Sequence, residues 1–198
     1  MIEPPGVQIF GQSELVEHLE SGGWHYSHCI SIGNPGRRVD RPDTVEPPEL
    51  RRHFRGILRL AFYDVEKVSH LGTMRPRRIP QRSDVRRVIR FVRRTRGEAT
   101  GYTLHCWRGS SRSPAVALGI LYLITGSEHE AGRILRRIRP DAAPHRGIVR
   151  YFDAELGCDL TPVSDRIRQE WIEKMRRELD LTEDALLEEL PEVADGEA

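Results

Sequence analysis

The chain has 198 residues, of which 38% are hydrophobic, and its formal net charge is only +1. This size fits one domain with a tail. Its three cysteines give no disulfide framework, and the longest apolar run, 115–124, is too short to cross a bilayer. The N-terminus shows no basic segment followed by an apolar one, so we expect no secretory signal. These features favour a soluble protein of the reducing cytoplasm.

The small net charge hides a strong asymmetry along the chain. Residues 1–35 carry −4, residues 36–150 carry +15 and residues 151–198 carry −10. A basic middle suits an anionic substrate or a nucleic acid. Aromatic residues do not interleave with the basic ones, so we favour a solvated arginine-rich surface over nucleic-acid binding. The acidic tail is expected to fold back on this basic surface.

The first half of the chain alternates apolar stretches with loops rich in proline and charged residues. In chain order we predict a strand at 7–10, a helix at 13–20 capped by Ser13, a strand at 24–32, a loop at 37–53, a strand at 54–63 and a loop at 65–82. Asp64 therefore stands between a strand and a long loop.

The second half begins with a helix capped by Ser83, in which apolar residues recur every three or four positions. We then predict a strand at 99–105, a helix at 115–124 stopped by Gly126, a helix from Ser127 to Pro140 and a helix at 145–156. Strands that alternate with helices predict an α/β fold. The expected architecture is a central, largely parallel sheet of four to five strands, flanked by helices on both faces.

We expect this domain to span 1–160 and an acidic helical tail to span 161–198. Ser164 is the predicted cap of a first tail helix, and Thr182 that of a second, shorter one ending at Pro191. The first helix carries an apolar stripe at near-four spacing, made of Ile167, Trp171, Met175 and Leu179. Such a stripe is expected to dock on its own domain rather than on a partner.

The chemically most informative segment is 105–113, which reads His-Cys-Trp-Arg-Gly-Ser-Ser-Arg-Ser. It joins a predicted strand to a predicted helix, and helix N-termini bind anions through their free N–H groups. A cysteine six positions before an arginine is a weak signal in so arginine-rich a chain. Gly109, which allows a tight turn, and Ser113 and Pro114, which open an apolar helix, make it a strong one.

With these additions, His-Cys-x-x-Gly-x-Ser-Arg-Ser resembles the signature of the cysteine-dependent protein tyrosine and dual-specificity phosphatases. The resemblance implies a tyrosine-phosphatase-like fold and hydrolysis of phosphate monoesters through a cysteinyl-phosphate. It implies phosphotyrosine, or phosphoserine and phosphothreonine, on a protein partner, and neither cofactor nor metal. The chain is nearer the small dual-specificity type, because it is too short for the elements that deepen the pocket of the larger enzymes.

The roles follow residue by residue. Cys106 is the expected nucleophile, since a helix N-terminus and Arg112 stabilise a thiolate. Arg112 presents a planar fork that matches two phosphate oxygens. Ser113, as the resemblance implies, hydrogen-bonds the thiolate, and His105 orients the loop. The phosphate cradle is expected to be lined by the backbone N–H groups of Trp107, Arg108, Gly109, Ser110, Ser111 and Arg112.

The leaving oxygen needs a general acid, and in the family this is a carboxyl group on a movable loop. We predict Asp64, because it ends a strand near the site. The chain has no Trp-Pro-Asp motif, and the gap from Asp64 to Cys106 is long for the family. Asp40 and Asp43 remain the reserve candidates, while Asp84 is interpreted as a first-turn helix acid.

Other interpretations stay open. Cys29 is either a buried core thiol or a redox partner of Cys106. His25 and His28 fall on opposite faces of a strand, which argues against a metal site. A non-catalytic phosphate-binding module, or a phosphatase for a phosphoinositide or an RNA 5′-phosphate, would also suit the segment; a sulfur transferase fits it less well. The physiological substrate, the oligomeric state and the role of the tail are not given by the sequence.

Overall fold

The computed structural model describes residues 6–35, 50–65 and 78–188, with side chains to Leu179. Four strands form one sheet in which every pair is parallel, in the order β1-β4-β2-β3. The strands are β1 (Gly6–Gly11), β2 (His28–Gly33), β3 (Gly56–Ala61) and β4 (Gly101–Cys106). Every residue of the central strand β4 is buried, as expected for a strand covered on both faces. The predicted parallel sheet is confirmed.

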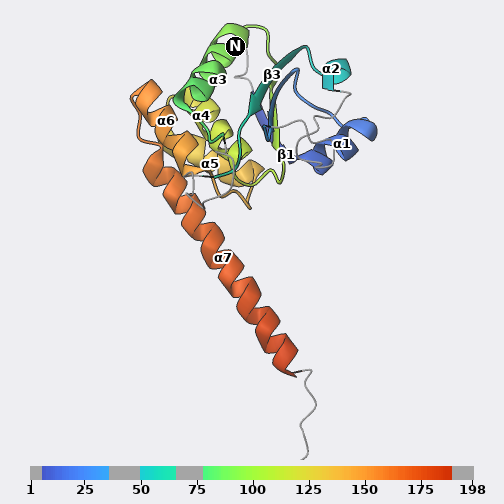
Figure 1. The fold of residues 1–198 in the computed structure, drawn as a ribbon, viewed down its shortest axis with the longest axis vertical. Coiled ribbons are helices and arrows are strands. Elements are labelled where there is room, and N and C mark those ends of the chain that lie inside the picture. Colours follow the sequence, from blue (N-terminus) through green and yellow to red (C-terminus); the bar gives the residue numbers. More distant parts are fainter. Residues whose placement is uncertain (1–5, 36–49, 66–77, 189–198) are drawn as a thin grey trace, which may run out of the picture.

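Helices cover both faces of this sheet (Figure 1). They are α1 (Gln12–Glu20), α2 (Leu50–His53), α3 (Arg82–Thr95), α4 (Arg112–Thr125), α5 (Glu128–Ile138), α6 (Arg146–Leu156) and α7 (Thr161–Glu188). The larger core lies on the side of α3, α4 and α6, where the apolar residues of α4 are almost all buried. A smaller cluster on the opposite side joins Leu15 of α1 and Leu50 of α2 to Cys29 of β2.

The predicted caps of α1 and α3 are wrong, because each helix begins one residue before the serine that was expected to cap it. Ser13 and Ser83 both lie inside their helices. In α1 and α3 the backbone N–H of the residue just before the helix donates to an acid of the first turn, Glu14 at 2.7 Å and Asp84 at 3.0 Å. The interpretation of Asp84 as a first-turn helix acid is confirmed. The short helix α2 falls at the end of the predicted loop 37–53, most of which lies outside the described residues.

The C-terminal helix α7 is continuous, so the two predicted tail helices are one. It begins at Thr161, whose backbone N–H and hydroxyl donate to the carboxylate of Asp153 at 3.2 and 2.6 Å. Ser164, the predicted cap, is instead a buried residue inside α7, and Thr182 also lies within the helix. None of the helices in the described part of the chain is both long and apolar enough to cross a membrane.

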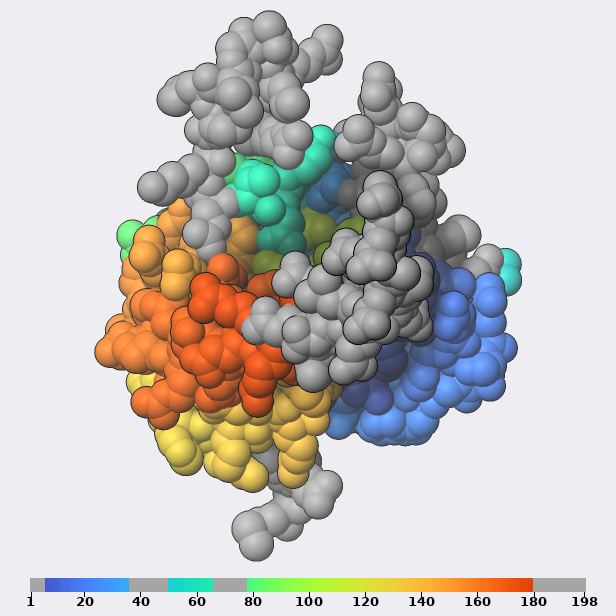
Figure 2. All heavy atoms as spheres, turned by 90° about the horizontal axis from the view of Figure 1, so that it is seen from below, coloured from blue at the N-terminus to red at the C-terminus, as the bar shows by residue number. Residues whose placement is uncertain are grey.

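The apolar stripe of α7 docks only at its beginning. Ile167 is buried and Trp171 half-buried, whereas Met175 and Leu179 are 36% and 60% exposed. Figure 1 shows α7 leaving the body of the molecule, and Figure 2 shows its first part (red) beside residues of α5 and α6 (yellow to orange). The prediction that the whole stripe packs on its own domain is therefore wrong for the distal half of α7.

Candidate active site

The turn between β4 and α4 brings Cys106 and Arg112 to the carboxyl end of the sheet, where α/β proteins place their ligands. Cys106 is the last residue of β4, and Arg112 is the first residue of α4. Both side chains are buried, with 1% and 3% of their surface exposed. We call residues 106–112 the Cys106 loop.

The backbone of this loop turns its carbonyl oxygens outward. Four of them accept hydrogen bonds from groups outside the loop: Trp107 from Gln12 N–H, Arg108 from the Arg139 guanidinium, Ser110 from Ala143 N–H and Ser111 from His145 N–H. A planar peptide unit points its N–H away from its C=O, so the N–H groups converge on the inside of the loop. None of the N–H groups of residues 107–111 donates to another described residue. The loop therefore provides a set of backbone N–H donors suited to a tetrahedral anion.

Gly109 makes this backbone path possible. Its φ of +73° lies in the left-handed region, which side chains disfavour. A Cβ at this position would also stand 2.6 Å from the backbone nitrogen of Gly11. The loop consequently packs directly against the junction of β1 and α1.

The thiol of Cys106 accepts a hydrogen bond from the side chain of Ser113. The Ser113 hydroxyl, itself fully buried, donates to Sγ at 3.1 Å. A donor at this distance stabilises a thiolate, and the N-terminus of α4 directly behind it acts in the same direction.

The guanidinium of Arg112 is positioned by hydrogen bonds from one of its nitrogens, Nη1. Its Nη1 donates to the side-chain oxygen of Asn34 at 2.7 Å and to the carbonyl of Phe62 at 2.9 Å. Its Nε is buried but has no hydrogen-bond partner among the described residues. The Nε edge therefore has capacity for the oxygens of an anion, and its geometry is fixed in advance by Asn34 and Phe62.

Asp64 lies at the rim of the same loop, three residues after β3. One carboxylate oxygen accepts a hydrogen bond from the Ser111 hydroxyl at 2.8 Å, and the other is 3.8 Å from Nε of Arg112. The side chain is 40% exposed, so it can meet a bound substrate. The reserve candidates Asp40 and Asp43 lie outside the described residues.

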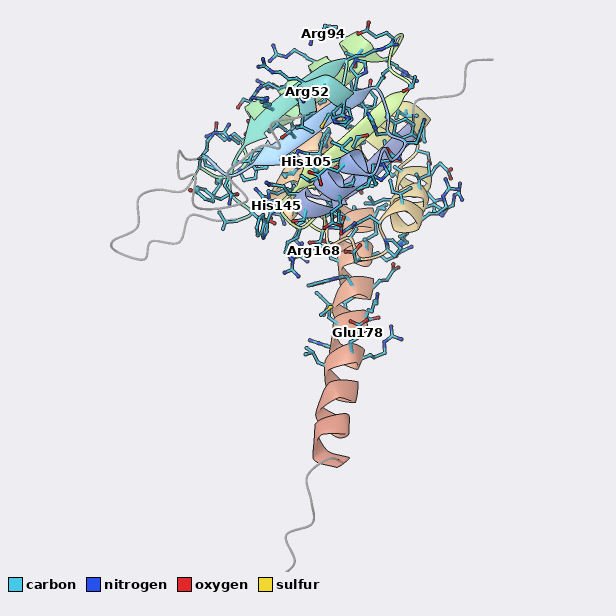
Figure 3. All side chains as sticks on the ribbon, turned by 90° about the vertical axis from the view of Figure 1, so that its right-hand side faces the viewer. Arg52, Arg94, His105, His145, Arg168 and Glu178 are labelled. Carbon is cyan, nitrogen blue, oxygen red and sulfur yellow. The ribbon has the colours of Figure 1, made fainter. Side chains whose placement is uncertain are left out.

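A cavity of about 730 Å³ opens over the Cys106 loop, and we call it the loop cavity. Its walls come from four parts of the fold: Ser13 and Glu14 of α1, Asp64 after β3, the segment from Arg139 to Ala143 after α5, and Arg168, Trp171, Lys174, Met175 and Glu178 of α7. In Figure 3, Arg168 marks the place where α7 meets the body and Glu178 the part that projects from it. The loop cavity is thus wider than the Cys106 loop alone.

One ion pair braces the loop from outside and was not foreseen from the sequence. The Arg139 guanidinium donates to both carboxylate oxygens of Glu14, at 2.8 and 3.1 Å, and to the carbonyl of Arg108 at 3.1 Å. These hydrogen bonds from Arg139 are the main reason why the pKa of Glu14 is lowered. Glu14 and Arg139 are 125 positions apart in the chain, so no local sequence pattern predicts this ion pair.

Asn34 was missed for a different reason. It stands in the segment Gly33-Asn34-Pro35-Gly36, which the sequence marks only as a turn. Its partner Arg112 is 78 positions away, and the contact depends on β2 lying beside β4 in the sheet.

Cys29 lies too far from Cys106 to pair with it in this fold. It is level with Thr103 in the β2–β4 register, three residues before Cys106. It belongs to the small cluster with α1 and α2, whereas Cys106 belongs to the large core. The three cysteines are free, and Cys29 is a fully buried core thiol.

His105 lies directly behind the loop, with both ring nitrogens buried and without a hydrogen-bond partner among the described residues. Burial, and secondly the charge of Arg112, lowers its pKa from 6.5 to about 4. Between these two values the folded protein therefore binds fewer protons than the unfolded chain. The contribution of His105 to stability is fully present above the unfolded pKa and is lost as the pH falls toward the folded pKa.

As the pH falls from about 7 to about 4.5, the protonation equilibrium of His105 alone should lower the free energy of unfolding by about 2 kcal/mol. Chemical denaturation of the wild type and of His105→Asn across this range measures the effect. The difference between the two proteins should change with pH by that amount; parallel profiles would contradict the assignment.

The sequence matches no protein-family model and no curated protein. The structure, however, is similar to solved structures. DUSP15 has a TM-score of 0.51 with 16% identity, over 83% of this chain and 92% of that one. The active form of Tk-PTP has a TM-score of 0.50 with 17% identity, over 82% and 95% of the two chains. The chain therefore has the fold of the cysteine-dependent phosphatases, as its signature segment led us to expect.

Proposed function

We propose that this protein is a cysteine-dependent phosphatase that hydrolyses phosphate monoesters, phosphotyrosine first among them, with Cys106, Arg112, Asp64 and Ser113 as its catalytic residues. The observation that carries the proposal is the arrangement around the Cys106 loop. It combines a buried thiol, an inward-facing set of N–H groups and a buried guanidinium whose Nε makes no hydrogen bond with the described residues and lies 3.8 Å from the Asp64 carboxylate. The fold shared with DUSP15 and Tk-PTP supports the same reading.

In the first step the Cys106 thiolate attacks phosphorus in line with the ester oxygen, forming an S–P bond as the P–O bond breaks. The loop N–H groups and the Nε edge of Arg112 hold the three remaining oxygens, where negative charge is concentrated in the transition state. The proton of Asp64 passes to the leaving oxygen, which departs as an alcohol or phenol.

In the second step water replaces the leaving group. The Asp64 carboxylate accepts a proton from water, the water oxygen bonds to phosphorus and the S–P bond breaks. The released thiolate is stabilised by the Ser113 hydroxyl, which is already 3.1 Å from Sγ. Inorganic phosphate leaves, and Asp64 is again protonated for the next cycle.

The assignment of the general acid can be tested apart from the rest. Asp64→Asn keeps the shape of the side chain but removes the proton it donates, so kcat for an alkyl phosphate should fall by roughly 10²- to 10⁴-fold. Steady-state kinetics on such a substrate and on an activated aryl phosphate measure the change. The loss should be smaller for the aryl ester, whose leaving oxygen needs less protonation.

Asp141→Asn is the matched control, because Asp141 lines the same loop cavity but forms its ion pair with Arg139, whereas Asp64 forms one with Arg112. It should retain most of the activity. An undiminished kcat in Asp64→Asn, with a large loss in Asp40→Asn or Asp43→Asn, would transfer the role to that aspartate.

A further inference from the structure

The part of the loop cavity formed by α7 has no role in the chemistry just described. Four of its residues, Arg168, Trp171, Met175 and Glu178, recur every three or four positions and so share one face of the helix. This face looks onto the Cys106 loop, because both line the same cavity. We call these residues the α7 wall, which borders the same cavity as Asp64 and the Cys106 loop.

Several apolar side chains that line the loop cavity are exposed or only half-buried. Trp107 of the loop is 40% exposed, Met175 is 36% exposed and Trp171, which lines the same cavity, is half-buried. Large apolar side chains grouped around a cavity mark a binding surface more often than isolated ones do. A ligand that covers them needs an apolar group close to its phosphate.

The charges around the cavity argue against a polyanionic ligand. Among the described residues, its lining contains four cationic and four acidic side chains: Arg108, Arg139, Arg168 and Lys174 against Glu14, Asp64, Asp141 and Glu178. Cations and acids of this lining pair with one another, Arg139 with Glu14 at 2.8 Å and Lys174 with Glu178 at 3.7 Å. RNA or a multiply phosphorylated inositol would require a clear excess of positive charge here.

Two arginines from the basic middle of the chain lie far from the loop cavity. Arg94 of α3 and Arg52 of α2 are at one end of the molecule in Figure 3, whereas Arg168 and Glu178 are at the other. The excess positive charge of the middle of the chain is thus not gathered, among the described residues, at the loop cavity.

We infer that α7 is a substrate-recognition wall for phosphorylated polypeptides, on which an apolar residue next to the phosphotyrosine packs against Trp171 and Met175. The inference rests on the proposed function and names its substrate class. The cavity, at about 730 Å³, has room for a phosphorylated side chain together with a neighbouring one. A peptide of mixed character also suits a lining of balanced charge.

The test compares three substrates: a small aryl phosphate, a phosphotyrosine peptide with leucine beside the phosphotyrosine, and the same peptide with glycine there. Trp171→Ala should lower the ratio of kcat/KM between the leucine peptide and the aryl phosphate by roughly 10- to 30-fold, mainly through KM. Trp171→Phe should restore most of the ratio. Leu179→Ala is the matched control, since Leu179 is exposed on α7 but does not line the cavity.

Binding of the same peptides to Cys106→Ser protein gives a readout that needs no turnover. The leucine peptide should bind more tightly than the glycine peptide, and adding Trp171→Ala should remove the difference. Absence of turnover with this preference intact would contradict the proposed function but support the role of α7. Equal ratios in the wild type and Trp171→Ala, or tighter binding of RNA or a phosphoinositide than of the leucine peptide, would overturn the inference.

Discussion

Replacement of Cys106 by serine is expected to lower turnover of an aryl phosphate by roughly 10⁴-fold or more. The substitution places a hydroxyl group at nearly the position of the thiol. A serine hydroxyl, however, is a far weaker nucleophile than the thiolate that the proposed mechanism requires. Vanadate, which adopts the geometry of the transition state, should inhibit the wild type.

Cys158→Ser provides the control for this experiment. Burial, together with the charge of Asp153, raises the pKa of the Cys158 thiol to about 12, so that this cysteine stays protonated and unreactive. Cys158→Ser should therefore keep wild-type activity. Full activity in Cys106→Ser would remove the basis of the proposed mechanism.

The second large effect is expected for Arg112→Lys, which should reduce kcat/KM by roughly 10²- to 10⁴-fold. Lysine keeps the charge but loses the planar fork that holds two oxygens at once. It also cannot contact Asn34 and Phe62 through one nitrogen while a second nitrogen holds the phosphate, the arrangement that we propose for Nη1 and Nε of Arg112. Kinetics with the same aryl phosphate provide the measurement.

Arg90→Lys is a suitable comparison, because Arg90 is an exposed arginine of α3. It should behave as the wild type. If Arg112→Lys were equally active, the guanidinium would have no part in holding the phosphate. If the wild type bound phosphopeptides without any turnover, the protein would be the non-catalytic binding module that the sequence also allows.

The sequence was sufficient to predict the elements of the fold that are encoded locally. The alternation of apolar strands and helices predicted the parallel sheet, and the segment 105–113 predicted the turn that joins Cys106 to Arg112. The hydrogen bond from Ser113 to Sγ was expected from the resemblance and is present in the structure. These features depend on residues close together in the chain.

What could not be predicted depends on contacts between distant segments. Asn34 reaches Arg112, and Glu14 reaches Arg139, only because the sheet order brings their elements together. The beginning of α7 was misplaced for a similar reason, since Asp153 of the preceding helix accepts its first hydrogen bonds. The serines that were expected to cap helices compete with acids that local sequence reasoning does not rank above them.

The central claim is that a covalent phosphoenzyme forms on Cys106, and rapid acid quenching tests it most directly. The wild type is mixed with an aryl phosphate carrying a radiolabelled phosphoryl group and quenched during the first turnover, and the labelled peptide is mapped by mass spectrometry. We expect the label on the peptide containing Cys106, accumulating further in Asp64→Asn and absent in Cys106→Ser. Turnover without a labelled chain, or a label on any other residue, would contradict the mechanism.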